Sequence, residues 1–90
     1  MRLESHLERA FVKHIIRTGG EVRKVQWIGR HGAPDRVVLY PDGEITWVEL
    51  KTTTGALRPG QIREHERLRN MGQHVLVIRT KEEYEHHFPL

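Results

Sequence analysis

Apolar residues recur with helical spacing at the start of the chain. The repeat comprises Leu3, Leu7, Ala10, Phe11 and Ile15. Positions three and four residues apart share one face of an α-helix, and the pair Gly19 and Gly20 that follows forms a stop signal. The pattern predicts an amphipathic helix over residues 4–18.

The middle of the chain changes to strand-like sequence. Residues 21–29, EVRKVQWIG, have strand composition, with Val25 and Trp27 on one face and the loop GRHGAP following the strand. Two apolar segments, DRVVLY and ITWVELK, then flank a Pro-Asp-Gly-Glu sequence. Because Asp-Gly favours the tight turns of hairpins, we expect a β-hairpin over residues 35–51.

The last third predicts a helix, a strand and a short closing helix. Pro59 has the first-turn position of a helix that ends near Gly72. Residues 74–79, HVLVIR, have the apolar pattern of a strand buried on both faces. Thr80 and Glu83 have the spacing of a capping box, which predicts a helix over residues 81–87. The expected fold is α/β, a mixed β-sheet flanked by helices in the order α-β-β-β-α-β-α, with the last two strands parallel.

Composition limits the class of protein. Ninety residues bury one core, so we expect a single domain over residues 1–90. The absence of cysteine excludes disulfides, thiolate zinc sites and a cysteine nucleophile, which fits a cytoplasmic, intracellular protein. The apolar runs are too short for a membrane span, and the charged start is unlike a signal peptide. A net charge of +3 is compatible with a polyanionic partner without requiring one.

Two acids and a lysine stand out because they interrupt apolar strands. Side chains alternate along a strand, so Trp47, Glu49 and Lys51 share one face. Asp35 joins them in the hairpin register that pairs Asp35 with Glu49 and Val37 with Trp47, whereas a slip of one residue separates them. Two carboxylates ~4 Å apart repel by about 4 kcal/mol at an intermediate dielectric. A divalent cation offsets this repulsion better than a lysine alone, which indicates metal-assisted phosphate chemistry.

Helix geometry adds two further candidates. Glu8 has apolar residues at i+3, i+4 and i+7, so it lies on the flank of the first helix's apolar face, and Glu4 is a weaker candidate for the same role. Gln61 shares a stripe with His65 and Leu68 and is expected to point toward the sheet. An amide there can position water, a carboxylate or a phosphate oxygen.

These residues resemble the PD-(D/E)-x-K nuclease superfamily and, in more detail, its VRR-NUC family. The matching pieces occur in the family's order and span nearly the whole chain: Glu8; Gly19-Gly20 with Lys24; Gly32-Ala33-Pro34-Asp35-Arg36; Val48-Glu49-Leu50-Lys51; and Pro59-Gly60-Gln61. The specificity of the match comes from five ordered pieces with compatible spacing. The resemblance implies a restriction-endonuclease-like fold and a metal-dependent DNA endonuclease.

The resemblance also implies a role for each matched residue. Asp35 and Glu49 are expected to bind Mg²⁺ or Mn²⁺ together with the backbone carbonyl of Leu50, and Glu8 is expected to complete the site directly or through water. Such a metal supplies the hydrolytic chemistry by lowering the pKa of its bound water and by polarising the phosphate.

The lysine and the amide of the matched motifs complete the expected chemistry. Lys51 is expected to orient the attacking water and stabilise charge on the phosphate, and Gln61 to hold that water or the lysine.

The expected substrate is DNA, which is recognised by its shape and bound mainly through its phosphates. The candidate DNA-binding cations are Arg23, Lys24, Arg30, Arg36, Arg58 and Arg63. Small relatives of this kind resemble Holliday-junction resolvases. We therefore expect a homodimer that acts on branched DNA in DNA repair. We also expect no small-molecule cofactor and a phage or prophage setting.

Two alternatives stay open from the residues alone. The chain can be a non-catalytic nucleic-acid-binding module, or an accessory subunit, that keeps a nuclease-like fold. A histidine-based metal or hydrolase site is disfavoured, because His86 and His87 are adjacent and point to different sides, and the other five histidines lack ligand spacing.

Overall fold

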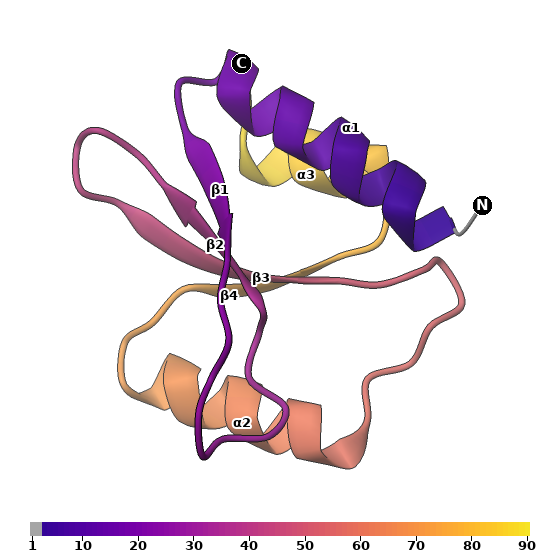
Figure 1. The fold of residues 1–90 in the computed structure, drawn as a ribbon, viewed down its shortest axis with the longest axis vertical. Helices are drawn as coiled ribbons and strands as arrows, with labels where there is room; N and C mark the ends of the chain where they lie inside the picture. The colour runs from indigo at the N-terminus through magenta and orange to yellow at the C-terminus, as the bar shows by residue number, and fades with distance from the viewer. Residues whose placement is uncertain (1–2) are drawn as a thin grey trace.

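The computed structural model describes residues 3–90 and confirms the expected order of elements. The elements are α1 (Leu3–Arg17), β1 (Glu21–Lys24), β2 (Arg36–Leu39), β3 (Ile45–Leu50), α2 (Pro59–Asn70), β4 (Val75–Ile78) and α3 (Lys81–His87). The strands form one mixed sheet with helices on both sides, as Figure 1 shows.

The sheet has the order β1-β2-β3-β4, in which β1, β2 and β3 are antiparallel neighbours and β3 and β4 are parallel. The hairpin register pairs Val37 with Trp47, as predicted. Asp35 precedes β2, but its carbonyl accepts a hydrogen bond of 2.9 Å from the Val25 amide, which continues the β1–β2 ladder by one pair. Alternation along the strands therefore puts Asp35 and Glu49 on the same face of the sheet.

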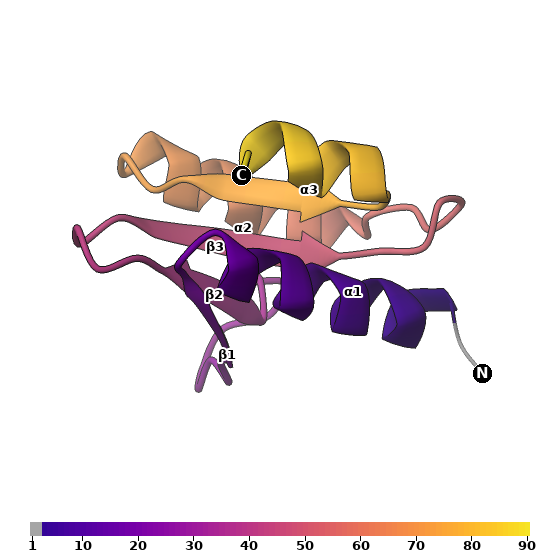
Figure 2. The ribbon, with the colours of Figure 1, turned by 90° about the horizontal axis from the view of Figure 1, so that it is seen from above.

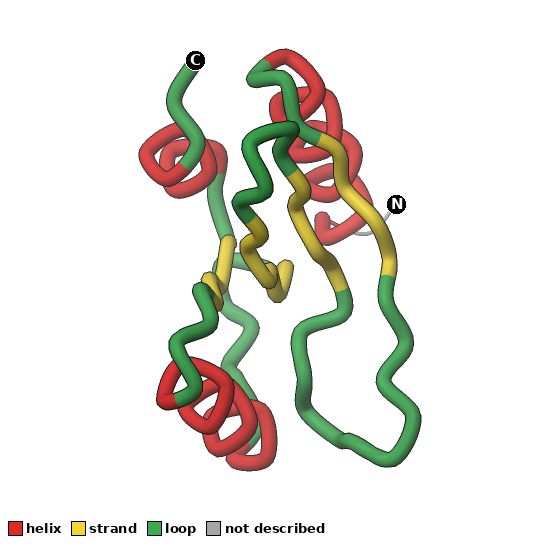
Figure 3. Tube along the Cα trace, turned by 90° about the vertical axis from the view of Figure 1, so that its left-hand side faces the viewer, coloured by secondary structure: helices red, strands yellow, loops and turns green. Residues whose placement is uncertain are grey.

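The two faces of the sheet carry different layers. On one face, α1 and α3 lie side by side over the strands (Figure 2), and the main core forms there from Phe11, Ile15, Val38, Val48, Leu50, Ile78, Tyr84 and Phe88. On the other face lies α2 (Figures 1 and 3). The main apolar core thus lies away from Asp35 and Glu49, which share their face with α2.

The C-terminal helix is fixed at both ends. At its start, the Glu83 amide donates to the Thr80 hydroxyl at 3.2 Å and the Thr80 amide donates to the Glu83 carboxylate at 3.0 Å, so the predicted capping box is confirmed. Beyond its end, His14 of α1 lies 2.6 Å, Nε2 to O, from the Phe88 carbonyl. His14 is buried, so this histidine serves the packing of α1 against the C-terminal segment.

Residues 25–29 differ from the predicted strand. β1 ends at Lys24, and residues 25–35 form a long loop on the same side as α2 (Figure 3). The Trp27 indole N–H donates to the Pro34 carbonyl at 2.8 Å, and its ring lies 5.0 Å from that of Trp47. The side chain that suggested a strand therefore anchors a loop.

The prediction that the last strand is buried on both faces was wrong in part. β4 is an edge strand, in which Val75 and Ile78 are buried while Leu76 and Val77 are half-buried. In residues 3–90, no helix is long and apolar enough to cross a membrane.

Candidate functional site

Asp35 lies where the long loop returns to the sheet. Its neighbour Pro34 is fully buried and accepts the Trp27 hydrogen bond, so the backbone is fixed immediately before the aspartate. The Asp35 side chain is 57% exposed. The loop thus presents a solvent-accessible carboxylate from a rigid base.

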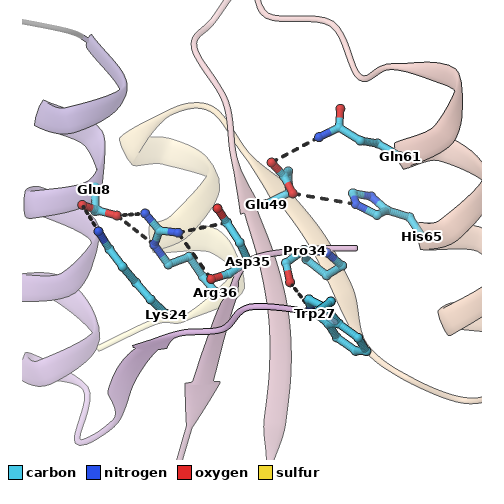
Figure 4. Close-up of polar contacts among 9 residues, drawn as sticks. All are labelled: Glu8, Lys24, Trp27, Pro34, Asp35, Arg36, Glu49, Gln61 and His65. Carbon is cyan, nitrogen blue, oxygen red and sulfur yellow. Dashed lines mark hydrogen bonds and ion pairs between the residues drawn. The ribbon is translucent and has the colours of Figure 1, made fainter. Parts of the chain in front are cut away.

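Glu49 lies on the same sheet face but is buried. In Figure 4 it points toward α2, where the Gln61 amide nitrogen donates to its Oε2 at 3.4 Å. The Gln61 amide oxygen accepts the Arg58 backbone N–H at 2.9 Å, as part of the cap at the start of α2. This capping contact leaves the Gln61 NH₂ group directed at Glu49, so the prediction that Gln61 points toward the sheet is confirmed. Its partner is the glutamate.

Lys51 continues β3 beyond its last assigned residue. Its amide donates to the Ile78 carbonyl at 3.0 Å, which keeps the backbone extended and the side chain on the face of Glu49. Its positive charge also acts on His65 of α2. Lys51 therefore belongs to the same local cluster as Glu49, as expected.

His65 is a further residue of the candidate site, and it was not among the residues predicted from the sequence. Its Nε2 lies 4.0 Å from the Glu49 Oε1 (Figure 4), and the residue is fully buried. Burial lowers the pKa of His65, and the positive charges of Arg69 and Lys51 lower it further, so the ring is neutral at physiological pH. The available signal was its position one helical turn after Gln61 on the same face.

Arg36 joins two of the predicted metal ligands. Its Nε donates to the Glu8 Oε2 at 2.8 Å, a second guanidinium nitrogen contacts the same oxygen, and a third lies 3.0 Å from the Asp35 Oδ1. Lys24 lies 3.9 Å from Glu8. Arg36 is a predicted DNA contact; in the structure its side chain is 14% exposed and is shared by two carboxylates.

The predicted carboxylates form two groups. Among the side chains of residues 5–90, no three histidines, aspartates or glutamates are placed to hold one metal ion. Glu8 projects from α1, which covers the opposite face of the sheet, and meets Asp35 only through the Arg36 guanidinium (Figure 4). Glu49 instead faces Gln61 and His65. The metal role of Glu8 stays a prediction, and Glu4 lies outside the described side chains.

The Glu8–Arg36 pair predicts a pH-dependent stability. The hydrogen bond from Arg36 lowers the pKa of Glu8 from its ordinary value of 4.5, although burial opposes the shift. A carboxyl whose pKa is lower in the folded chain stabilises it above pH 4.5 and loses this contribution as pH falls through the folded value. Glu8→Gln is therefore expected to cost about 1 kcal/mol of unfolding free energy near neutral pH, and less as the pH drops below 4.5.

Urea denaturation at several pH values measures this difference. Glu66→Gln, at an exposed position on α2, is the matched control and is expected to change the unfolding free energy little at any pH. A Glu8→Gln cost that stays constant down to strongly acidic pH contradicts the ion-pair account.

Two known proteins resemble this chain along almost its whole length. A protein named "Putative nuclease p44", from Acyrthosiphon pisum secondary endosymbiont phage 1, is 38% identical over 84 residues, which cover 91% of this chain and 90% of that protein. No family model matches the sequence. A solved structure described as "VRR_NUC domain" superposes with a TM-score of 0.84 at 36% identity, over 92% of this chain and 90% of the other. This chain belongs to the VRR-NUC family.

Family membership confirms the resemblance and the fold expected from the sequence. The mixed four-stranded sheet with three helices is the VRR-NUC nuclease fold. The chain is thus a nuclease domain by sequence and by fold. The roles of individual site residues stay predictions.

The remaining predicted DNA-binding cations of the VRR-NUC domain lie at the surface. Lys24 has a 73% exposed side chain, Arg23 pairs with its neighbour Glu21, and Arg58 is exposed. Arg30 and Arg63 line a hollow of ≈ 250 Å³ beside the start of α2. Its other lining residues are Gly29, His31, Gly60, Glu64 and Arg67. Arg67 is a further cation in this hollow and was not among the predicted DNA-binding residues.

Gly32 holds the Asp35 loop of the VRR-NUC domain against α2. Its φ is +83°, and a Cβ there would lie 2.6 Å from the Gly60 carbonyl oxygen and 2.9 Å from the Gln61 Cα. Both are backbone atoms, so no side-chain rotation relieves the contact. Only glycine lets the loop that carries Asp35 approach the helix that carries Gln61 this closely.

Gly32→Ala is therefore expected to destabilise the domain by about 3 kcal/mol, through left-handed backbone strain and overpacking. Gly29→Ala is the matched control, because Gly29 has a φ of +78° but nothing within 4 Å of its would-be Cβ. Its expected cost is only about 1 kcal/mol of backbone strain. Urea unfolding of both variants measures the difference, and equal costs contradict the role given to the close contact.

Proposed function

We propose that this VRR-NUC domain is a metal-dependent, structure-specific endodeoxyribonuclease that hydrolyses phosphodiester bonds. The observation that carries the proposal is the placement of Asp35 and Glu49 on one face of neighbouring strands, with Lys51 next in alternation after Glu49. Family membership supports nuclease chemistry, and the cluster supplies the residue types that hydrolysis of a phosphate requires.

The donor set fits a hard divalent cation. Mg²⁺ commonly takes one or two protein carboxylates and fills its other positions with water and substrate phosphate oxygens, so Asp35 and Glu49 are sufficient protein anchors. The Leu50 backbone carbonyl is the proposed additional ligand, and Glu8 the proposed outer one. When bound, Mg²⁺ or Mn²⁺ supplies Lewis acidity that polarises the phosphate and acidifies the attacking water.

The protein side chains position the other reacting groups. The Lys51 ammonium orients the attacking water and stabilises the negative charge that develops on the phosphate. As the water oxygen bonds to phosphorus, the bond from phosphorus to the 3′ oxygen breaks, which leaves a 5′-phosphate and a 3′-hydroxyl. Gln61 holds Glu49 in place through its amide, and holding the attacking water or Lys51 stays its predicted further role.

The exposed cations indicate how DNA approaches. Lys24 and Arg23 lie on β1, Arg30 on the long loop, and Arg58 and Arg63 at the start of α2. The long loop joins β1 to Asp35 and lies against the start of α2 at Gly32, so phosphate contacts from all three elements are proposed to position a strand at Asp35. In the described chain no helix-turn-helix or zinc finger is present to read bases, so recognition of DNA shape is proposed.

Branched DNA such as a Holliday junction is the proposed substrate, cut inside the cell by a homodimer. Two symmetry-related sites suit a substrate with two equivalent strands. Light scattering of the protein with and without a junction tests the assembly, and a monomer in both samples contradicts it.

One observation favours a second candidate, a non-catalytic nucleic-acid-binding module. Arg36 pairs with both Glu8 and Asp35, and Lys24 lies 3.9 Å from Glu8, so two cations already offset these two carboxylates and weaken the electrostatic need for a metal there. A cleavage panel separates the candidates: junction, flap and linear duplex DNA incubated with Mg²⁺, Mn²⁺ or EDTA. The nuclease proposal expects cleavage of branched DNA with either metal and none in EDTA. Binding without cutting supports the module instead.

A further inference from the structure

His65 is an energetic anomaly in the interior of the domain. The side chain is fully buried, and within the described chain neither of its ring nitrogens makes a hydrogen bond of good geometry. The Gly32 backbone interacts with the ring, but it is the smallest of the influences on the pKa of His65. A buried polar group without a partner costs on the order of 1–3 kcal/mol. A leucine or phenylalanine at this position avoids that cost, so packing alone does not account for the histidine.

The His65 imidazole faces one carboxylate, that of Glu49. Gln61 and His65 are one turn apart on α2 and face the same way. Gln61 contacts the Oε2 of Glu49 at 3.4 Å, while the Nε2 of His65 lies 4.0 Å from the Oε1. Figure 4 shows the two side chains reaching Glu49 from the same helix. Helix α2 therefore places one side-chain nitrogen near each oxygen of the Glu49 carboxylate.

We propose that His65 is a positioning residue for the metal-binding glutamate. Its Nε2–H donates to the Oε1 of Glu49 in the metal-loaded domain, and His65 and Gln61 together fix the carboxylate in the orientation that binds the cation. This inference rests on the proposed function, since it assumes that Glu49 binds a metal.

The required movement is small. A normal N–H···O hydrogen bond spans about 2.7–3.2 Å, so closing the present separation takes roughly 1 Å of side-chain adjustment. The start of α2 is held by the close contact of Gly32 with Gly60, so the helix is a firm base for the donors. Partners of this kind orient ligating side chains and typically change metal affinity 10- to 100-fold.

The test measures Mn²⁺ binding to the DNA-free chain, by the electron paramagnetic resonance of free Mn²⁺, alongside thermal unfolding. His65→Leu removes the donor and fills the space. It is expected to raise the Kd for Mn²⁺ by about 10- to 100-fold while leaving the Tm unchanged or higher. A merely structural role predicts the reverse, a lower Tm with an unchanged Kd.

A pair of polar variants makes the test independent of the leucine variant. His65→Gln places an amide N–H near the position of Nε2 and is expected to keep most of the affinity, whereas the shorter His65→Asn is expected to lose it. Leu68→Ala, at a buried position on the same helix, is the packing control. It is expected to lower the Tm without changing the Kd.

The outcomes distinguish failure of the positioning role of His65 from failure of the proposed nuclease function. If Glu49→Gln abolishes Mn²⁺ binding but all His65 variants bind like the unmodified chain, the positioning role is overturned and the proposed function stands. If the unmodified chain neither binds Mn²⁺ nor cuts DNA, the proposed function fails and the positioning role fails with it.

Discussion

Asp35→Asn is expected to abolish DNA cleavage by this VRR-NUC domain while leaving DNA binding intact. The substitution keeps the size of the side chain but removes the charge that attracts a divalent cation, and loss of such electrostatic assistance costs on the order of 10³-fold or more in rate. Because Asp35 is more than half exposed and its backbone is fixed by Pro34, the fold is expected to tolerate the change. Single-turnover cleavage in Mg²⁺, with a gel shift in Ca²⁺, measures both quantities.

Asp42→Asn is the matched control for Asp35→Asn. Asp42 lies in the hairpin turn, where its Oδ1 accepts the Glu44 amide at 2.9 Å, a bond that asparagine also makes. The cleavage rate of the Asp42→Asn variant is expected to equal that of the unmodified chain. Undiminished cleavage by Asp35→Asn rules out the aspartate as a metal ligand, and lost DNA binding points instead to a role in holding Arg36.

Lys51→Ala is the second substitution with a large expected effect. It removes the cation that stabilises developing phosphate charge, so we expect kcat to fall by about 10²- to 10³-fold with little change in KM. Mn²⁺ binding is expected to persist, because the carboxylates are untouched. Steady-state kinetics on a branched substrate measures the split.

Lys81→Ala provides the control for lost positive charge. Lys81 is exposed at the start of α3, on the side of the sheet opposite α2, so its removal is expected to leave kcat and KM unchanged. A Lys51→Ala variant that raises KM and keeps kcat contradicts a role in the chemical step and indicates a substrate-binding lysine.

Local sequence signals predicted most of the fold. The Asp-Gly turn and the alternation of the two hairpin strands indicated the register, since a slip of one residue would have moved Val37 and Trp47 to opposite faces. The Thr80 capping box and the Pro59 helix start were likewise confirmed. Such signals act over a few residues, and the tertiary structure left them unchanged.

The long loop escaped prediction because its anchors are distant in sequence. Val25 and Trp27 have strand composition, but the Trp27 indole finds a better partner in the Pro34 carbonyl and packs on Trp47. Periodicity cannot reveal such contacts. Tertiary packing outweighed local propensity here.

The site residues on the strands could be predicted from the sequence, but their contacts with the helices on either face of the sheet could not. Alternation alone brought Asp35, Glu49 and Lys51 to one face. The partners of Arg36 depend on how α1 docks on the other face, which no local pattern encodes, so the sequence did not reveal that this residue pairs with Glu8 and Asp35. His65 was overlooked because a histidine on an apolar helix stripe usually serves packing.

Diffraction from crystals of the domain grown with Mn²⁺ tests the central claim most directly, because anomalous scattering locates the ion independently of activity. The account predicts a peak between the carboxylates of Asp35 and Glu49, lost in Glu49→Gln crystals. A peak elsewhere, for example at His86 and His87, with none at Asp35 and Glu49 in a domain that cuts DNA, contradicts it.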